Sequence, residues 1–476
     1  MMMPESEMQA ELPGGDGPSE NVRSLRSRLL SAAVWSAIGR ILAVGAFYGS
    51  HFLLGRYLEK SHYAAYLMVS VVVATTTIAV TFGTAQILIR TIRKKVNAVQ
   101  AIASCLKIVV FFGCIASLVL LIVSDHLGAG ERWNGIREYV PWVAIWFIAS
   151  AASLIASSAL QAMDQFRLGV LVGAKNGGLL PNVLFFLSLV ISSQFEILDL
   201  GFVIILRSVL QLLTLIPAFI FTKNSISIHR TKNFDGQARE DIAAPTAKWF
   251  LSESWYTLVT QFVVLGMAEL DVLIVGFFVA DGDFANYGVA KTLINVVRIP
   301  LLMASVFLGP FIAELYYANQ IDRLEKILRG AATIVGLPCL LIALAFVIFP
   351  NAILELTFGN GYPEAVPLLR ILTFGTVVFV LTGCNGLTLI MTGHQRELMI
   401  CSIGVLLIYL TLSPLILSYW GVWGGAWLNS ILVASLNLFV TIMVRIKVNI
   451  WTTASPSCAT LKLSLQSILK KPAASP

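Results

Sequence analysis

Phe52-Leu53-Leu54-Gly55-Arg56-Tyr57, followed by Tyr66, is a stretch that returns later in the chain as Ile274-Val275-Gly276-Phe277-Phe278, followed by Tyr287. In both copies the glycine precedes the tyrosine by eleven positions and stands at the end of a long apolar run. A second pair of related stretches joins apolar runs in each half: Gln161-Ala162-Met163-Asp164-Gln165-Phe166-Arg167 and Met391-Thr392-Gly393-His394-Gln395-Arg396. This repetition predicts two related halves around a central site, an arrangement common among transporters.

The composition indicates an all-α integral membrane protein. Hydrophobic residues make up 57% of the 476 positions and charged residues only 12%, too few to cover a water-soluble fold of this size. Apolar runs of about 20 residues cross the hydrocarbon layer as helices, because lipid offers no partner to an unpaired backbone amide. About twelve such spans are expected, at residues 31–54, 64–89, 103–123, 139–160, 168–192, 201–221, 254–279, 285–315, 328–349, 365–391, 398–417 and 422–444.

The spans divide the chain into two predicted six-helix bundles, residues 31–222 and 254–446, joined by a cytoplasmic linker at 223–253. The polar segments 1–30 and 447–476 are expected to be disordered cytoplasmic tails. With both termini inside, twenty-two Lys and Arg residues fall on the cytoplasmic side and only Arg56, Lys60, Arg132 and Arg137 outside. The net charge of +7 then reflects an inner surface that faces anionic lipid, and no nucleic acid is needed to explain it.

Seven cations fall inside predicted spans: Arg40, Lys107, Lys175, Arg207, Lys291, Arg298 and Arg370. A charge inside the bilayer is costly, so such groups generally face a cavity or a partner. Lys107, Lys175 and Arg370 lie near span ends, where their long side chains can reach the interface. Lys291 and Arg298 are seven residues apart, which places them on one face of a helix. They are expected either to line a cavity or to pair with Glu269, Asp271 or Glu314.

Glu269 and Asp271 are the acidic residues deep in the seventh predicted span. Residues two positions apart on an α-helix point about 200° away from one another, so both carboxylates do not easily face one cavity. One of them is expected to be a counter-ion for Lys291 or to couple transport to a proton or sodium gradient. The loops contain no phosphate-binding loop, nucleophile elbow or glycosyltransferase-like acidic pattern, which argues against an enzyme. No metal site and no cofactor is predicted.

Several motifs, in this order and spacing, resemble Wzx-type polysaccharide flippases over residues 24–446. They are Leu53-Leu54-Gly55 through Tyr66, Phe82-Gly83-Thr84-Ala85 through Arg90, Asp271 through Tyr287, Leu354 through Tyr362 with Leu368-Leu369-Arg370-Ile371-Leu372, Thr392-Gly393-His394-Gln395-Arg396, and Gly421-Val422-Trp423-Gly424-Gly425-Ala426. The resemblance implies a MATE-like fold of two pseudo-symmetric six-helix bundles, within the multidrug/oligosaccharidyl-lipid/polysaccharide exporter superfamily. It also implies a multi-pass protein of the inner (plasma) membrane.

The cargo implied by this resemblance is a polyprenyl-diphosphate-linked oligosaccharide, moved from the cytoplasmic to the periplasmic leaflet for a surface polysaccharide. Membrane lipids, a polysaccharide polymerase and chain-length proteins are the implied partners. Arg40, Arg207, Lys291 and Arg298 are the expected contacts of the diphosphate, and Asp271 and Glu269 the expected ion-coupling residues. Two other functions stay open: a drug or metabolite exporter of the same superfamily, and a membrane-embedded glycan polymerase.

Overall fold

A computed structural model of the chain describes residues 20–93, 97–127, 137–173, 178–195, 197–233 and 246–454. The described part is helical, and the first half contains α1 (Glu20–Tyr57), α2 (Lys60–Thr81), α3 (Thr84–Arg93), α4 (Ala98–Leu127), α6 (Val140–Ala162), α7 (Phe166–Val172), α8 (Leu179–Ser192), α9 (Leu200–Leu213) and α10 (Leu215–Asn233). The second half contains α11 (Ala247–Phe278), α12 (Asp281–Tyr317), α13 (Ile321–Ile348), α14 (Pro350–Phe358), α15 (Ala365–Thr382), α16 (Asn385–Met391) and α17 (Gln395–Val448). The expectation of an all-helical, multi-span membrane protein is confirmed.

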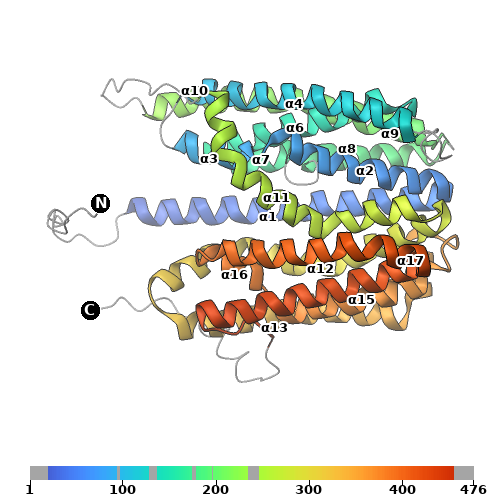
Figure 1. Cartoon of the computed structure of the whole chain (residues 1–476). Coiled ribbons are helices and arrows are strands. Elements are labelled where there is room, and N and C mark those ends of the chain that lie inside the picture. Colours follow the sequence, from blue (N-terminus) through green and yellow to red (C-terminus); the bar gives the residue numbers. More distant parts are fainter. Residues whose placement is uncertain are drawn as a thin grey trace.

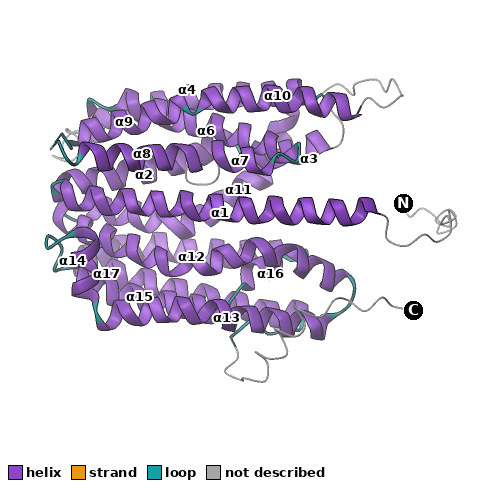
Figure 2. Cartoon of the chain, turned by 180° about the vertical axis from the view of Figure 1, so that it is seen from behind, coloured by secondary structure: helices purple, strands orange, loops and turns teal. Residues whose placement is uncertain are grey.

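The helices form two bundles that lie side by side (Figure 1). We call α1 to α10 the N-lobe and α11 to α17 the C-lobe. The two lobes meet where α2 packs against α11 and α12, and where α1 reaches α12 and α14. One end of the molecule carries residues 58–59, 279–280 and α14, and we call it the α14 face (Figure 2). The opposite end carries the turns at residues 318–320 and 392–394.

Several predicted spans are interrupted where a residue adopts a left-handed backbone conformation. The second span is divided into α2 and α3 at Phe82 and Gly83, with φ of 49° and 70°. Gly383, with φ of 70°, separates α15 from α16, and Gly421, with φ of 55°, divides α17 into the last two predicted spans. Among the described residues, nine helices are long and apolar enough to cross a membrane, and α17 is counted once.

Three helices extend into segments that the sequence analysis assigned to a disordered tail or to the linker. α1 begins at Glu20, inside the stretch expected to be a disordered tail, and α10 continues to Asn233 in the expected linker. α11 begins at Ala247, also within that linker, while residues 234–245 lie outside the described part. The short helix α14 has no counterpart among the predicted spans, because its nine residues are fewer than a bilayer crossing requires.

The repeated glycines explain how closely the two lobes approach one another. A Cβ atom on Gly55 would lie 2.3 Å from Cδ1 of Phe358, and one on Gly276 would lie 3.1 Å from Sδ of Met68. Each glycine therefore makes room for a side chain of the other lobe. Small residues at such crossings allow helices in lipid to gain van der Waals contact, since no hydrophobic effect drives them together there. The repeated stretch thus lies at the contact between the lobes.

Candidate functional site

Asp271 on α11 is the centre of a buried polar cluster in the C-lobe. Its Oδ2 atom accepts hydrogen bonds from Lys291 Nζ at 2.5 Å, from Tyr287 Oη at 2.6 Å and from Asn429 Nδ2 at 2.9 Å. Asp271 and Lys291 are only 4% and 3% exposed. A buried carboxylate needs such donors, because removing a charge from water is otherwise prohibitive. The cluster joins α11, α12 and the second half of α17.

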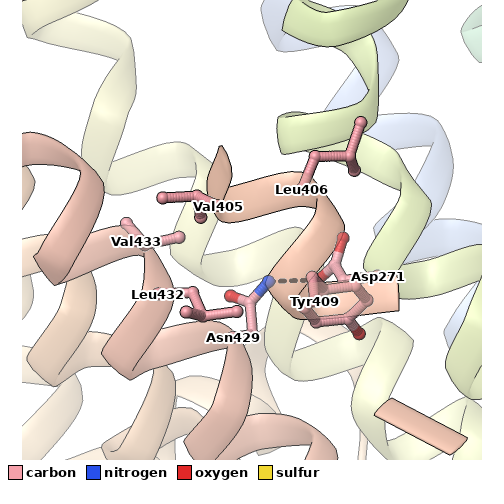
Figure 3. A pocket seen from close by; sticks show the side chains of 7 residues that line it. All are labelled: Asp271, Val405, Leu406, Tyr409, Asn429, Leu432 and Val433. Atoms are coloured by element: carbon pink, nitrogen blue, oxygen red, sulfur yellow. Dashed lines mark hydrogen bonds between the residues drawn. The ribbon is translucent and has the colours of Figure 1, made fainter. Parts of the chain in front are cut away.

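Asp271 also lines a small cavity beside this cluster (Figure 3). The cavity measures about 20 Å³ and is lined by Asp271, Val405, Leu406, Tyr409, Asn429, Leu432 and Val433. Asp271 Oδ1 and Tyr409 Oη have no hydrogen-bond partner within the described residues. This volume is enough for one water molecule. The carboxylate thus contacts three donors and lies beside a small cavity with a mostly apolar lining.

Arg298 lies on α12, seven residues beyond Lys291, at the boundary between the lobes. Its Nη2 atom donates to Thr376 Oγ1 on α15 at 3.3 Å, and its guanidinium lies 5.3 Å from the ring centre of Phe379. Tyr48 of α1 and Glu269 of α11 are close enough to interact with it electrostatically. Arg298 Nε is buried and lacks a hydrogen-bond partner in the part of the chain that the structure describes. The guanidinium therefore retains a free donor at the point where α1, α11, α12 and α15 converge.

The two acids and two cations of this region balance one another in formal charge. Glu269 is half-buried, with Lys291, Arg298 and Asp271 as its electrostatic neighbours. Of the acids expected to pair with Lys291, Asp271 on the preceding helix forms the ion pair. In a low-dielectric interior such compensation lowers the cost of burying each charge. A ligand that binds Lys291 must therefore take the place of the Asp271 carboxylate.

Arg40 and Arg207 lie in the N-lobe, apart from this cluster. Arg40 is half-buried on α1, and its Nε atom is buried without a hydrogen-bond partner among the described residues. Arg207 on α9 is 5% exposed and donates to the carbonyl oxygen of Pro181 at 3.1 Å and to Asn182 Oδ1 at 2.7 Å. Its guanidinium also lies 4.9 Å from the ring centre of Phe185. The four cations predicted to contact cargo are thus divided between the lobes.

Sequence reasoning did not assign Tyr287, Asn429, Tyr48 or Thr376 to the site. Tyr287 is the tyrosine of the repeated stretch, so its spacing was a usable signal, and Asn429 is a polar residue within an apolar run. Nothing in the spacing of Tyr48 or Thr376 places them near Arg298, because they come from α1 and α15. The described residues contain no group of three or more His, Cys, Asp or Glu that could hold a metal ion.

The cations assigned to span ends differ in exposure from those of the cluster. Lys107 on α4 and Arg370 on α15 are exposed on the surface of the helix bundle, where their side chains can extend toward the interface. Lys175 lies outside the described residues.

The sequence matches no family model, and it matches none of the curated proteins. The fold, however, is similar to that of solved transporters. An inward-facing multidrug resistance MATE family transporter of the MOP superfamily matches with a TM-score of 0.65 at 14% identity, covering 88% of this chain and 98% of that one. The Vibrio cholerae MATE transporter VcmN in its bent form gives 0.57 at 15% identity, covering 90% and 98%.

The lipid II flippase MurJ, in an inward closed conformation, matches with a TM-score of 0.58 at 13% identity, covering 92% of this chain and 91% of that one. At these identities the likeness concerns the fold. The chain is therefore a multi-pass membrane protein with the MATE-like fold found in MOP superfamily transporters, which confirms the fold expected from the motifs.

Proposed function

We propose that this protein flips a polyprenyl-diphosphate-linked oligosaccharide from the cytoplasmic to the periplasmic leaflet of the plasma membrane by alternating access. The observation that carries this proposal is Arg298, a half-buried cation at the lobe boundary whose buried Nε donor is unused within the described structure. A diphosphate cannot cross hydrocarbon unless its charge is compensated, and guanidinium groups bind phosphate oxygens with strong, directed hydrogen bonds. The fold shared with both exporters and a lipid II flippase is compatible with this cargo.

Counter-ion exchange is the mechanism that this geometry supports best. An entering diphosphate competes with Glu269 and Asp271 for Arg298 and Lys291, and the displaced carboxylates then bind protons or sodium ions. The total charge inside the membrane stays nearly constant during such an exchange, which avoids the penalty of an uncompensated buried charge. Glu269 and Asp271 thereby link cargo binding to an ion gradient. The prenyl tail remains in lipid while the lobes rock about the site.

The proposed role of Arg298 predicts an order of flipping activities among its variants. Purified protein is reconstituted into liposomes with a fluorescent undecaprenyl-diphosphate trisaccharide, and flipping is measured as the fraction of probe protected from a membrane-impermeant quencher. Arg298→Ala should reduce flipping at least tenfold, whereas Arg298→Lys should keep part of it, because an ammonium retains the charge but not the planar fork of donors.

Arg370→Ala is the matched control, since it removes an exposed cation from α15 and should leave flipping unchanged. Parent-like flipping by well-folded Arg298→Ala would refute the proposed role.

A multidrug exporter is the second candidate, favoured by the half-buried carboxylate of Glu269 and by the likeness to MATE exporters. A cationic drug would require that carboxylate and would be repelled by Arg298. The same vesicles therefore separate the two functions when they are loaded with a cationic dye. Dye efflux that is lost in Glu269→Gln and raised in Arg298→Ala would support the exporter and contradict the flippase.

A further inference from the structure

α14 and the loop that follows it contain two aromatic side chains that are buried although they lie at an end of the molecule. Phe358 is 1% and Tyr362 3% exposed, whereas Leu356 on the same short helix is 78% exposed. α14 is drawn at the end of the bundle opposite the start of α1 (Figure 2). Burial of two rings at such a position requires a partner surface, and that surface belongs to the N-lobe.

Phe358 occupies the space left by the missing side chain of Gly55. The ring is so close that a Cβ atom on Gly55 would lie 2.3 Å from Cδ1 and 2.8 Å from Cε1. Phe52 on α1 meets the same ring edge-on at a centroid distance of 5.2 Å, and Tyr63 on α2 lies at 6.1 Å. An aromatic ring enclosed in this way removes a large apolar area from water and gains edge-to-face contact as well. Phe358 therefore packs into the junction of α1 and α2.

Tyr362 adds a directed bond between the lobes. Its hydroxyl donates to the carbonyl oxygen of Gly55 at 2.9 Å, and Lys60 Nζ lies 5.5 Å from its ring centre. That carbonyl belongs to the last turn of α1, where backbone oxygens have no helical partner. The hydroxyl is protonated at neutral pH and is therefore a donor, and burial raises its pKa further, to about 12.

The segment is fixed to the C-lobe at its base and reaches the N-lobe with its aromatic side chains. Asn286 Nδ2 of α12 donates to Glu364 Oε2 at 2.9 Å, just after the loop. Gly359, with φ of 79°, begins the loop, and a side chain on Gly361 would meet nothing within 4 Å. The two aromatic side chains therefore contact the N-lobe, whereas the end of the loop is bound to the C-lobe.

We propose that Phe358 and Tyr362 form a latch that holds the lobes closed on the α14 face, and that both side chains must leave Gly55 whenever this face opens. The latch acts on the conformational cycle, so it would serve any cargo that passes between the lobes. Gly55 of the repeated stretch then has a second role, because it leaves the space that receives the Phe358 ring.

Latch docking can be measured without cargo. In a full-length chain with its native cysteines replaced, spin labels at Tyr57→Cys and Leu356→Cys, both exposed, report the distance between the end of α1 and α14. The parent should give one narrow distance distribution. Phe358→Ala should add a longer-distance population at least threefold larger than in the parent, and Tyr362→Phe a smaller one. Phe349→Ala, which changes a 61% exposed phenylalanine beside α14, is the matched control.

A cross-link tests whether the latch must open during transport. Gly55→Cys with Phe358→Cys removes the crowding ring and brings two thiols within disulfide reach, because Cγ of Phe358 lies 3.6 Å from the Cβ position on Gly55. Oxidation should stop flipping of the reconstituted lipid-linked probe, and a reductant should restore it. In the same background without native cysteines, Gly55→Cys with Phe358→Ala carries one thiol and should be insensitive to oxidant.

Two results would overturn the latch. One is an unchanged distance distribution in folded Phe358→Ala, and the other is full flipping by protein that is completely cross-linked. If the distance distributions shift as expected but the parent sequence never flips the probe, that result would instead count against the proposed cargo, since the distance measurement needs none.

Discussion

The buried pair of Lys291 and Asp271 should show strong energetic coupling. Replacing Lys291 with Met removes the ammonium group that lies 2.5 Å from Oδ2 and leaves the carboxylate with only Tyr287 and Asn429 as donors. Breaking a buried ion pair from one side typically costs about 3–5 kcal/mol, because the remaining charge is buried without compensation. We therefore expect Lys291→Met to lower the free energy of unfolding by about that amount.

A second substitution should restore most of this loss. Asp271→Asn in the Lys291→Met background removes the uncompensated charge but keeps an oxygen that Tyr287 and Asn429 can still reach. Replacing both members of a buried pair by neutral residues of similar volume is often close to neutral. The double variant should therefore be several kcal/mol more stable than additivity of the two single variants predicts.

The assay is denaturant unfolding of the purified protein in detergent micelles, followed by tryptophan fluorescence. Lys107→Met is the control, because it removes an exposed lysine from α4 and should change the free energy of unfolding by less than about 0.5 kcal/mol. A cost below about 1 kcal/mol for Lys291→Met would refute the reasoning. A double variant that is no more stable than Lys291→Met would refute it too.

Arg207→Lys should lower the free energy of unfolding by about 2 kcal/mol, because charge-assisted hydrogen bonds are lost, and flipping per folded molecule should be unchanged. Loss of flipping at full stability would instead favour a contact between Arg207 and the cargo. Gly375→Ala should cost about 1–3 kcal/mol, because its Cβ would lie 2.6 Å from the carbonyl oxygen of Ser430. Gly336→Ala, whose nearest neighbour is a side-chain atom at 3.6 Å, should be tolerated in the same unfolding assay. In intact cells, a membrane-impermeant maleimide should label Leu356→Cys from outside but reach Gln320→Cys only after permeabilisation; the reverse pattern would invert the proposed topology.

The spans and the general type of fold followed from the sequence because lipid imposes a simple rule on it. Every backbone polar group in the hydrocarbon layer must be paired within the chain, so long apolar runs become helices. Each predicted span corresponds to a described helix, a pair of broken helices or one half of α17. The repeat of Gly55 and Gly276 likewise indicates a two-lobed molecule from the sequence alone.

The partners of the buried charges depended on how the helices pack and rotate against one another. Lys291 could have paired with Glu269, Asp271 or Glu314, and only the packing of α11 against α12 brings Asp271 to it. Arg207 has its partners on α8.

The latch is the clearest case of a feature that required the tertiary structure. Its hydrogen bond joins Tyr362 to Gly55 across 307 positions of the chain. Hydropathy reports only which residues avoid water, and it is nearly uniform around helices that face lipid on one side and protein on the other. The sequence alone therefore predicted which segments cross the membrane, whereas tertiary packing selected which polar groups meet between them.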